Sequence, residues 1–306
     1  MRAAVIDVGS NSVRLLLMEG MTPWGAVGER RVTVTGLRRG AHADGSVASA
    51  AITRLDACLA DYAERIAAAG GPPVVAVGTS AVREAPNRAA ILAVVLRRLG
   101  CDLRVVTGRE EGALAFAGAR LVMSGASGTC TVVDIGGGST EVVQGGDAGP
   151  EHAVSLPLGV NRQGEHLTGD PPPPERVDAI AADAAAMVGA ATQAFGRTGM
   201  VIGVAGTVTT TAAIQMGRYD PDRIHGMVIT RADVADVLGR VSAVDGRERS
   251  RIPGLHPDRV NSIVPGLAIL LGSLRALGAD DLVVSERDLL DGVAMEWAHA
   301  GAGPSH

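Results

Sequence analysis

The chain has 306 residues, of which 46% are hydrophobic and 2% aromatic, and its formal net charge is −5. This length is enough for two domains with separate cores. The negative charge and the scarcity of aromatic rings argue against a nucleic-acid partner, which would need basic charge or stacking surfaces. Polar residues interrupt the apolar N-terminal run, so we expect no signal peptide and no membrane partner. Three widely spaced cysteines are typical of free thiols in a reducing compartment, so we expect a cytoplasmic protein.

The first half of the sequence is predicted to begin with a β-hairpin. A short apolar run ends at Asp7, a glycine-polar turn occupies residues 9–12, and a second apolar run follows. Residues 45–69 then show helical periodicity. In chain order, the expected elements are strands at 3–7, 13–18 and 31–35, a helix at 45–69, a strand at 74–77, a helix at 88–99, a strand at 103–106 and a helix at 110–123.

Residues 124–128 are small and flexible, and we expect the domain boundary there, between domains at 1–124 and 125–306. The last helix, at about 289–300, is expected to pack back on the first domain. In chain order, the expected elements of the second half are strands at 131–134, 141–143 and 153–156, a helix at 175–195, a strand at 200–204, a helix after 205–207, a helix at 257–277, a strand at 282–284 and a helix at 289–298.

The two halves begin with similar stretches, AAVIDVGSNSVRLLLM and TVVDIGGGSTEVV. Each is a strand that ends in an acid, Asp7 or Asp134, followed by a turn of glycine and polar residues and by a second strand. A duplicated α/β fold with two actin-like (ribonuclease H-like) domains would place these turns opposite each other across a cleft. The alternative is that each is only a tight hairpin, in which the glycines serve the turn.

The two turns have the composition of anion-binding sites. Glycines let the backbone approach a ligand closely, so that several N–H groups can point at one phosphate. Hydroxyl and amide side chains add further donors. The acid before each turn, Asp7 or Asp134, suits a hard divalent cation that bridges to phosphate. The turn residues expected to bind substrate are Gly9, Ser10, Asn11, Gly136, Gly137, Gly138 and Ser139.

Two arginines and two glutamates are further candidates. Arg14 lies in an apolar strand, where a buried charge needs a partner, and Arg83 follows a strand end, where α/β proteins bind ligands. A guanidinium group fits phosphate oxygens, although either arginine could instead lie on the surface. Glu110 and Glu111 begin a helix after a strand. They could complement the helix dipole, or one of them could accept a proton from an attacking water.

The chain resembles the exopolyphosphatase / guanosine pentaphosphate phosphohydrolase (Ppx/GppA) family, within the actin–sugar kinase–heat-shock ATPase superfamily. The resemblance extends over the length of the chain. The motifs that carry it are IDVGSNSVRLL at 6–16, GTSAVREAPN at 78–87, TGREEGALAFAGA at 107–119, VVDIGGGSTEVV at 132–143, SLPLGVNR at 155–162, GVAGTVTTTAAI at 203–214, IHGM at 224–227 and HPDRVNSIVPGLAIL at 256–270.

The resemblance implies a reaction and a set of roles. Such enzymes release terminal phosphoryl groups from linear inorganic polyphosphate, and the glutamate of their E-E-(G/A) motif is the general base. Here that residue is Glu111, with Glu110 beside it. Asp134 and Glu141 match metal-associated acids, with Asp7 as a further ligand, so Mg²⁺ or Mn²⁺ is expected and K⁺ is a candidate activator. The positions that match phosphate contacts are Arg14, Arg83, Gly136, Gly137, Gly138 and Ser139.

Several alternatives stay open. Longer family members carry a C-terminal helical domain and this chain stops before one, so short polymers are favoured. Guanosine pentaphosphate (pppGpp) is the alternative substrate. An ATP-dependent kinase would use the turn at Gly206 and Thr207, which are substrate-binding candidates here, to hold an adenosine group. A non-catalytic sensor would bind polyphosphate or guanosine tetraphosphate (ppGpp) without turnover. The sequence also leaves a homodimer open.

Overall fold

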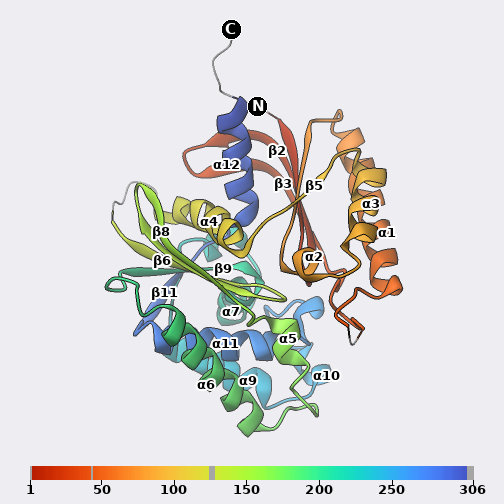
Figure 1. The fold of residues 1–306 in the computed structure, drawn as a ribbon. Helices are drawn as coiled ribbons and strands as arrows, with labels where there is room; N and C mark the ends of the chain where they lie inside the picture. Colours follow the sequence, from red (N-terminus) through yellow and green to blue (C-terminus); the bar gives the residue numbers. More distant parts are fainter. Residues whose placement is uncertain (1, 43, 124–127, 302–306) are drawn as a thin grey trace.

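The computed structural model describes residues 2–42, 44–123 and 128–301. They form two mixed β-sheets, one from each half of the chain, with helices packed around them (Figure 1). We refer to them as the N-terminal sheet, at the top of Figure 1, and the C-terminal sheet below it. Most of the domain boundary expected at 124–128 lies outside the described residues.

The N-terminal sheet has five strands in the order β3-β2-β1-β4-β5. Strands β1, β2 and β3 pair antiparallel, and β4 runs parallel to β1. Because side chains alternate along a strand, Ala4 and Ile6 of β1 pack under helices α1 and α3, whereas Ala3 and Val5 pack under α4 and α12. The bounds are β1 Ala3–Val8, β2 Val13–Thr22, β3 Gly25–Thr33, α1 Ser49–Ala68, β4 Val74–Gly78, α3 Arg88–Leu99, β5 Leu103–Val105, α4 Gly108–Ala119 and α12 Leu289–Gly301.

The C-terminal sheet repeats this topology, with the order β10-β11-β9-β6-β7-β8. Strands β6, β7 and β8 pair antiparallel, and β9 runs parallel to β6 as β4 does to β1. Strand β11 takes the place of β5, and β10 is an additional edge strand. The repeat confirms the predicted duplicated α/β fold. The bounds are β6 Cys130–Ile135, β7 Thr140–Gly146, β8 Gly149–Leu156, β9 Met200–Val204, β10 Val228–Thr230 and β11 Asp281–Val284.

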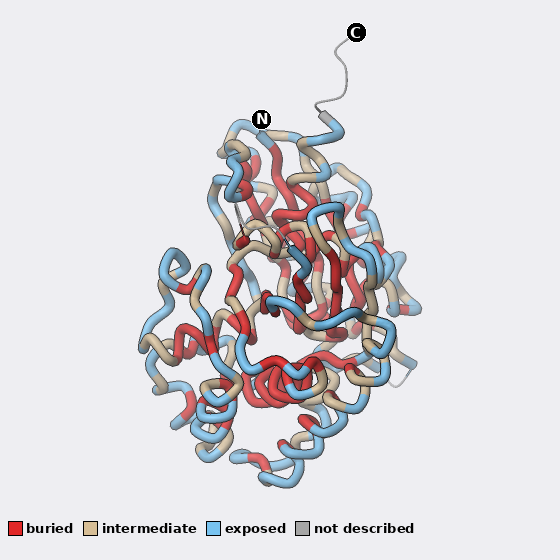
Figure 2. Tube along the Cα trace, turned by 90° about the vertical axis from the view of Figure 1, so that its left-hand side faces the viewer, coloured by how far each residue is buried: buried red, intermediate tan, exposed pale blue. Residues whose placement is uncertain are grey.

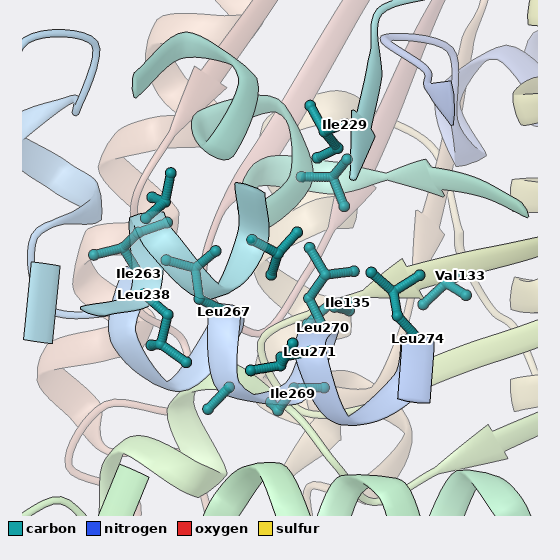
Figure 3. Packing of buried hydrophobic residues seen from close by; sticks show 14 of the residues in the cluster. Val133, Ile135, Ile229, Leu238, Ile263, Leu267, Ile269, Leu270, Leu271 and Leu274 are labelled. Carbon is teal, nitrogen blue, oxygen red and sulfur yellow. The ribbon is translucent and has the colours of Figure 1, made fainter. Parts of the chain in front are cut away.

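Helix α11 (Ile263–Ala276) is the centre of the C-terminal core. All of its residues from Ile263 to Leu274 are buried, and Figure 2 shows buried chain concentrated in the helix and the strands. In Figure 3, Leu270 and Leu274 of this helix lie next to the sheet residues Ile135 and Val133. Helices α6 (Pro174–Ala191), α7 (Ala205–Met216) and α9 (Arg231–Ser242) complete this layer. None of the described helices is both long and apolar enough to cross a membrane.

Helix α4 lies between the two sheets and contributes to the core of each (Figure 1). Leu114 and Ala115 pack with residues of the N-terminal sheet. Phe116 and Ala119 pack with residues of the C-terminal sheet. The first turn of α4 is therefore held at the junction of the two sheets, which is where the cleft was expected.

Several elements differ from those expected. The predicted helix at 257–277 is divided into a 3₁₀ turn, η2 (Pro257–Arg259), and α11, because Pro265 suits only the first turn of a helix. The predicted helix at 110–123 ends as a 3₁₀ turn, η1 (Arg120–Met123). Helix α9 was not expected, although its buried residues recur with helical spacing. The other unexpected elements are β10 and the short helices α2 Ser80–Glu84, α5 Val160–Gly164, α8 Pro221–Ile224 and α10 Gly246–Arg249.

The C-terminal helix α12 packs against the N-terminal sheet and crosses α4 at close range. Leu289, Leu290 and Val293 join the apolar cluster of β1 and β2. Gly292 brings the α12 backbone against the backbone of Leu114, and a Cβ on Gly292 would overlap the Leu114 carbonyl. The last part of the chain therefore completes the core of the first.

Substitution of Gly292 by Ala is expected to lower the free energy of unfolding by about 1–3 kcal/mol, because overpacking forces the two helices apart. Gly239 in α9 is the matched control, since a Cβ at that position would meet no atom of another described segment within 4 Å. Gly239→Ala should leave the protein as stable or slightly more stable. Urea unfolding of both variants measures the difference. Equal stability of Gly292→Ala and wild type would contradict the packing.

Candidate active site

A cavity of about 80 Å³ lies where the first turn (residues 9–12) faces the second turn (residues 136–139). We call it the reaction cavity. Its walls also include the start of α4 and the start of α7, so segments that are far apart in the chain meet there. The predicted site residues that line it are Asp7, Gly9, Ser10, Asn11, Arg14, Glu111, Asp134, Gly136, Gly137, Ser139, Glu141, Gly206 and Thr207.

The two turns have matching backbone geometry and touch each other. The N–H of Gly9 donates to the Ser12 carbonyl over 3.0 Å, and the N–H of Gly136 donates to the Ser139 carbonyl over 2.9 Å. A Cβ on Gly137 would lie 2.8 Å from the Cβ of Ser10, which is too close for any larger residue. In this structure the glycine is therefore needed for the approach of the opposite turn.

Glu111 enters the cavity from the first turn of α4, and its side chain is buried. Burial raises the pKa of its carboxyl to about 7, although Arg83 acts to lower it. Arg83 Nη1 donates to Glu111 Oε2 over 2.9 Å and to the Val106 carbonyl over 2.8 Å. Arg83 thus fixes the orientation of Glu111, and burial in the cavity keeps the pKa of the Glu111 carboxyl near neutral pH.

Two buried acids on the C-terminal sheet share the cavity with Glu111. Asp134 lies next to the end of β6 and Glu141 lies opposite it on β7, as paired residues of the antiparallel ladder. Burial raises the pKa of Asp134 to about 7 and the pKa of Glu141 well above its ordinary value. Ser155 Oγ on β8 donates to Glu141 Oε1 over 2.7 Å. Two carboxylates held this close in a buried site favour a bound cation or a shared proton.

Asp7 lies on the opposite side of the cavity and is also buried. Its Oδ2 accepts a hydrogen bond from Arg14 Nε over 2.9 Å, whereas its Oδ1 is buried and has no hydrogen-bond partner among the described residues. Burial raises the pKa of Asp7, against the effect of Arg14. A carboxylate oxygen without a hydrogen-bond partner, in a cavity that two further acids line, is a suitable ligand for a hard cation.

The carboxylates of the cavity therefore suit a divalent cation such as Mg²⁺, but they do not form a complete metal site by themselves. Within the described ranges, no group of three or more His, Cys, Asp or Glu side chains is arranged to hold a metal ion by itself. Mg²⁺ commonly binds through one or two carboxylates and keeps water and substrate phosphate as its other ligands. Asp7, Asp134 and Glu141 could supply such carboxylates.

Three predicted site residues do not line the reaction cavity. Glu110 is exposed, and its carboxylate accepts the Thr107 N–H over 2.7 Å as part of a capping box at the start of α4. Arg83 reaches the cavity only through Glu111. Gly138 does not line the cavity, and a Cβ on it would come within 2.8 Å of the hydroxyls of Ser10 and Ser80. Of the two adjacent glutamates, Glu111 therefore enters the cavity and Glu110 does not.

Sequence reasoning missed Arg259, whose guanidinium group packs over Gly206 at the start of α7. A Cβ on Gly206 would overlap that group, so only glycine at this position allows the arginine to pack there. Ala205, just before it, has a φ of +67°, an uncommon backbone conformation for a residue other than glycine. The only signal in the sequence was a basic residue within the HPDR segment.

The duplicated fold, the paired turns and the buried acids between them define a class of α/β proteins that process phosphoryl groups in a central cleft. Comparison with known proteins agrees with this class. The profile described as the Ppx/GppA phosphatase family matches residues 25–300. The chain belongs to the Ppx/GppA phosphatase family.

Relatives match the chain over almost its full length. Exopolyphosphatase 2 of Mycobacterium tuberculosis is 35% identical over 97% of this chain and 98% of its own. A crystal structure described as an exopolyphosphatase-like protein has 31% identity and a TM-score of 0.91, and the match covers 98% of this chain and 99% of the other. The Ppx/GppA family member of Aquifex aeolicus has 28% identity and a TM-score of 0.83, with 99% of each chain covered.

Proposed function

We propose that this protein is an exopolyphosphatase, which hydrolyses the terminal phosphoanhydride bond of linear inorganic polyphosphate. The observation that carries the proposal is the position of Glu111, buried in the reaction cavity beside Asp134 and Glu141 and opposite two turns rich in backbone N–H groups. The names of the similar exopolyphosphatases support the same activity.

In the proposed reaction, a water molecule attacks the terminal phosphorus in line with the bridging oxygen. Glu111 accepts the proton of that water, a P–O bond forms, and the bond to the bridging oxygen breaks so that the shortened chain leaves with the electron pair. The backbone N–H groups of both turns and of the start of α7 stabilise charge on the phosphoryl oxygens. Arg14 and Arg259 lie at the outer side of the cavity, next to the leaving chain.

We further propose that Asp134 and Glu141, with Asp7, hold Mg²⁺ next to the substrate. Bound there, the ion would offset negative charge on the transferred group. The proposal is supported by the raised pKa values of these acids and by the unpaired Asp7 Oδ1.

The metal proposal predicts a pH-dependent effect of Mg²⁺ on stability. The pKa of each buried acid is raised in the folded protein, so the folded state holds more protons than the unfolded state between about pH 4 and pH 7. Without metal, the stabilisation present below pH 4 is therefore lost as the pH rises through 7. Mg²⁺ should raise Tm strongly at pH 8 and weakly at pH 5.5.

Thermal unfolding with and without Mg²⁺ at these two pH values tests this expectation, and Asp134→Asn serves as the comparison variant. The variant should lose most of the increase in Tm at pH 8. An increase that is the same at both pH values, or one that Asp134→Asn retains, would assign the cation to another part of the molecule.

A second candidate substrate is guanosine pentaphosphate. A larger space of about 580 Å³, the outer chamber, adjoins the reaction cavity, and Arg14, Ala205, Gly206 and Arg259 line both. Tyr219 and several apolar side chains also line the outer chamber. A nucleoside would fit this mixture of aromatic, apolar and basic groups better than bare phosphate would.

Phosphate release in the presence of Mg²⁺ distinguishes the two substrates. Tripolyphosphate, longer polyphosphates of defined length and guanosine pentaphosphate would each be supplied separately. Release from the polyphosphates supports the proposed function, and release from guanosine pentaphosphate alone would move the activity to the nucleotide. Tight binding of these compounds without any release would instead indicate a sensor.

A further inference from the structure

The side chain of Arg14 is held between two carboxylates that come from opposite ends of the sequence. Its Nε and Nη2 lie 2.9 and 2.8 Å from Asp7 Oδ2, and its Nη1 donates to Asp288 Oδ2. Asp288 is 274 residues away along the chain. Arg14 lines both the reaction cavity and the outer chamber, whereas Asp288 lines only the outer chamber.

Asp288 is itself held firmly in place. Its Oδ1 accepts the N–H of Leu290 over 3.0 Å at the start of α12, which leaves Oδ2 for the arginine. Its backbone packs against α4, since a Cβ on Gly118 would overlap the Asp288 carbonyl. The same helix α4 carries Glu111, so the aspartate and the proposed base are placed by one rigid element.

The arrangement leaves part of the guanidinium group available. An arginine side chain has five N–H groups. Nε donates to Asp7, Nη1 donates to Asp288, and Nη2 lies 2.8 Å from Asp7 Oδ2, whereas the described residues accept no other hydrogen bond from this guanidinium group. The Arg14 side chain is only 17% exposed and lines both spaces, so the N–H groups left over lie near the junction of the cavity and the outer chamber.

We propose that Asp288 is a positioning residue that holds Arg14 in the orientation required to bind the phosphate chain next to the bond that is cleaved. The inference rests on the proposed hydrolysis of polyphosphate. A carboxylate beside a polyanion site weakens binding by repulsion unless it orders a cation that contacts the substrate. Positioning and repulsion therefore have opposite effects on KM, and their signs can be distinguished.

The test is Asp288→Asn, which keeps the size of the side chain and an oxygen that can cap α12 but removes the charge. We expect KM for tripolyphosphate to rise about tenfold, the equivalent of roughly one charge-assisted hydrogen bond, with kcat within about threefold of wild type. A KM equal to or lower than that of wild type would overturn the proposal, because the only effect of the Asp288 charge would then be to repel the polyphosphate. Glu296→Gln is the control, since this acid on α12 is exposed and pairs with Arg104.

A double-mutant cycle separates positioning from a general loss of structure. In an Arg14→Gln background, Asp288→Asn should leave KM unchanged or lower it, because only the repulsion remains to be removed. A further rise in KM in that background would show that Asp288 does not act through Arg14. A lower kcat, a higher KM and a lower Tm together in the single variant would likewise mean that Asp288 has a structural role and does not position Arg14.

Binding without turnover keeps this inference distinct from the proposed function. Titration of tripolyphosphate into Glu111→Gln and into Glu111→Gln/Asp288→Asn should show an approximately tenfold weaker Kd in the double variant. If the wild-type protein also released no phosphate, that result would refute the proposed activity but still support the role of Asp288 in binding. Equal Kd values would remove the role of Asp288, whatever the activity.

Discussion

Replacement of Glu111 by Gln is expected to lower kcat for polyphosphate hydrolysis by about 10²- to 10⁴-fold, the usual contribution of a general base. The amide can still accept the hydrogen bond from Arg83 Nη1, so the geometry of the cavity should persist. The substrate should still bind, and KM should change little. Steady-state phosphate release from tripolyphosphate measures both constants.

The neighbouring glutamate provides the matched control. Glu110 caps α4 and does not line the reaction cavity, so Glu110→Gln should retain nearly full activity. Glutamine can replace glutamate in a capping box, and the loss of stability should be small. If both variants lost activity to the same extent, the effect would come from damage to the start of α4, and Glu111 would lose its assignment as the base.

Replacement of Arg83 by Gln is expected to lower kcat/KM by about 10²-fold and to move the rising part of the pH–rate profile to higher pH. Arg83 acts to lower the pKa of Glu111, against the larger effect of burial. Without the arginine the carboxyl group would keep its proton to a higher pH, and less of it would be available as a base. The measurement is kcat/KM from pH 5.5 to pH 9.

Arg104→Gln is the control for charge, since this arginine is exposed and pairs with Glu296. It should leave both the rate and the profile unchanged. An Arg83→Gln variant with a lower rate but an unshifted profile would mean that the arginine contacts the substrate and does not tune Glu111. This second result would match the role that the family resemblance implies for Arg83.

The parts of the site that sequence could predict are those carried by short, local patterns. The two glycine-polar turns follow strands that end in an acid, so Asp7 and Asp134 could be placed opposite each other from the internal repeat alone. Residue order alone left Glu110 and Glu111 equivalent. The capping box distinguishes them in the structure, because it turns the Glu110 carboxylate toward Thr107, whereas Glu111 enters the cavity.

The partners of these residues could not be predicted, because they come from distant segments. Ser155, which contacts Glu141, lies one strand further along the sheet, and its role depends on the β7–β8 register. Asp288 reaches Arg14 only because α12 returns to the N-terminal sheet. Arg259 depends in the same way on where η2 ends. Tertiary packing decides such contacts, and no local propensity encodes them.

The return of α12 to the N-terminal sheet also has a consequence for synthesis on the ribosome. Leu289, Leu290 and Val293 of α12 cover β1 and β2, which are translated long before them. Domains usually fold in order as they emerge, and contacts between distant segments form late. One apolar face of the nascent N-terminal sheet therefore stays partly uncovered until α12 has left the exit tunnel. Truncated products of this protein should accordingly aggregate or engage chaperones.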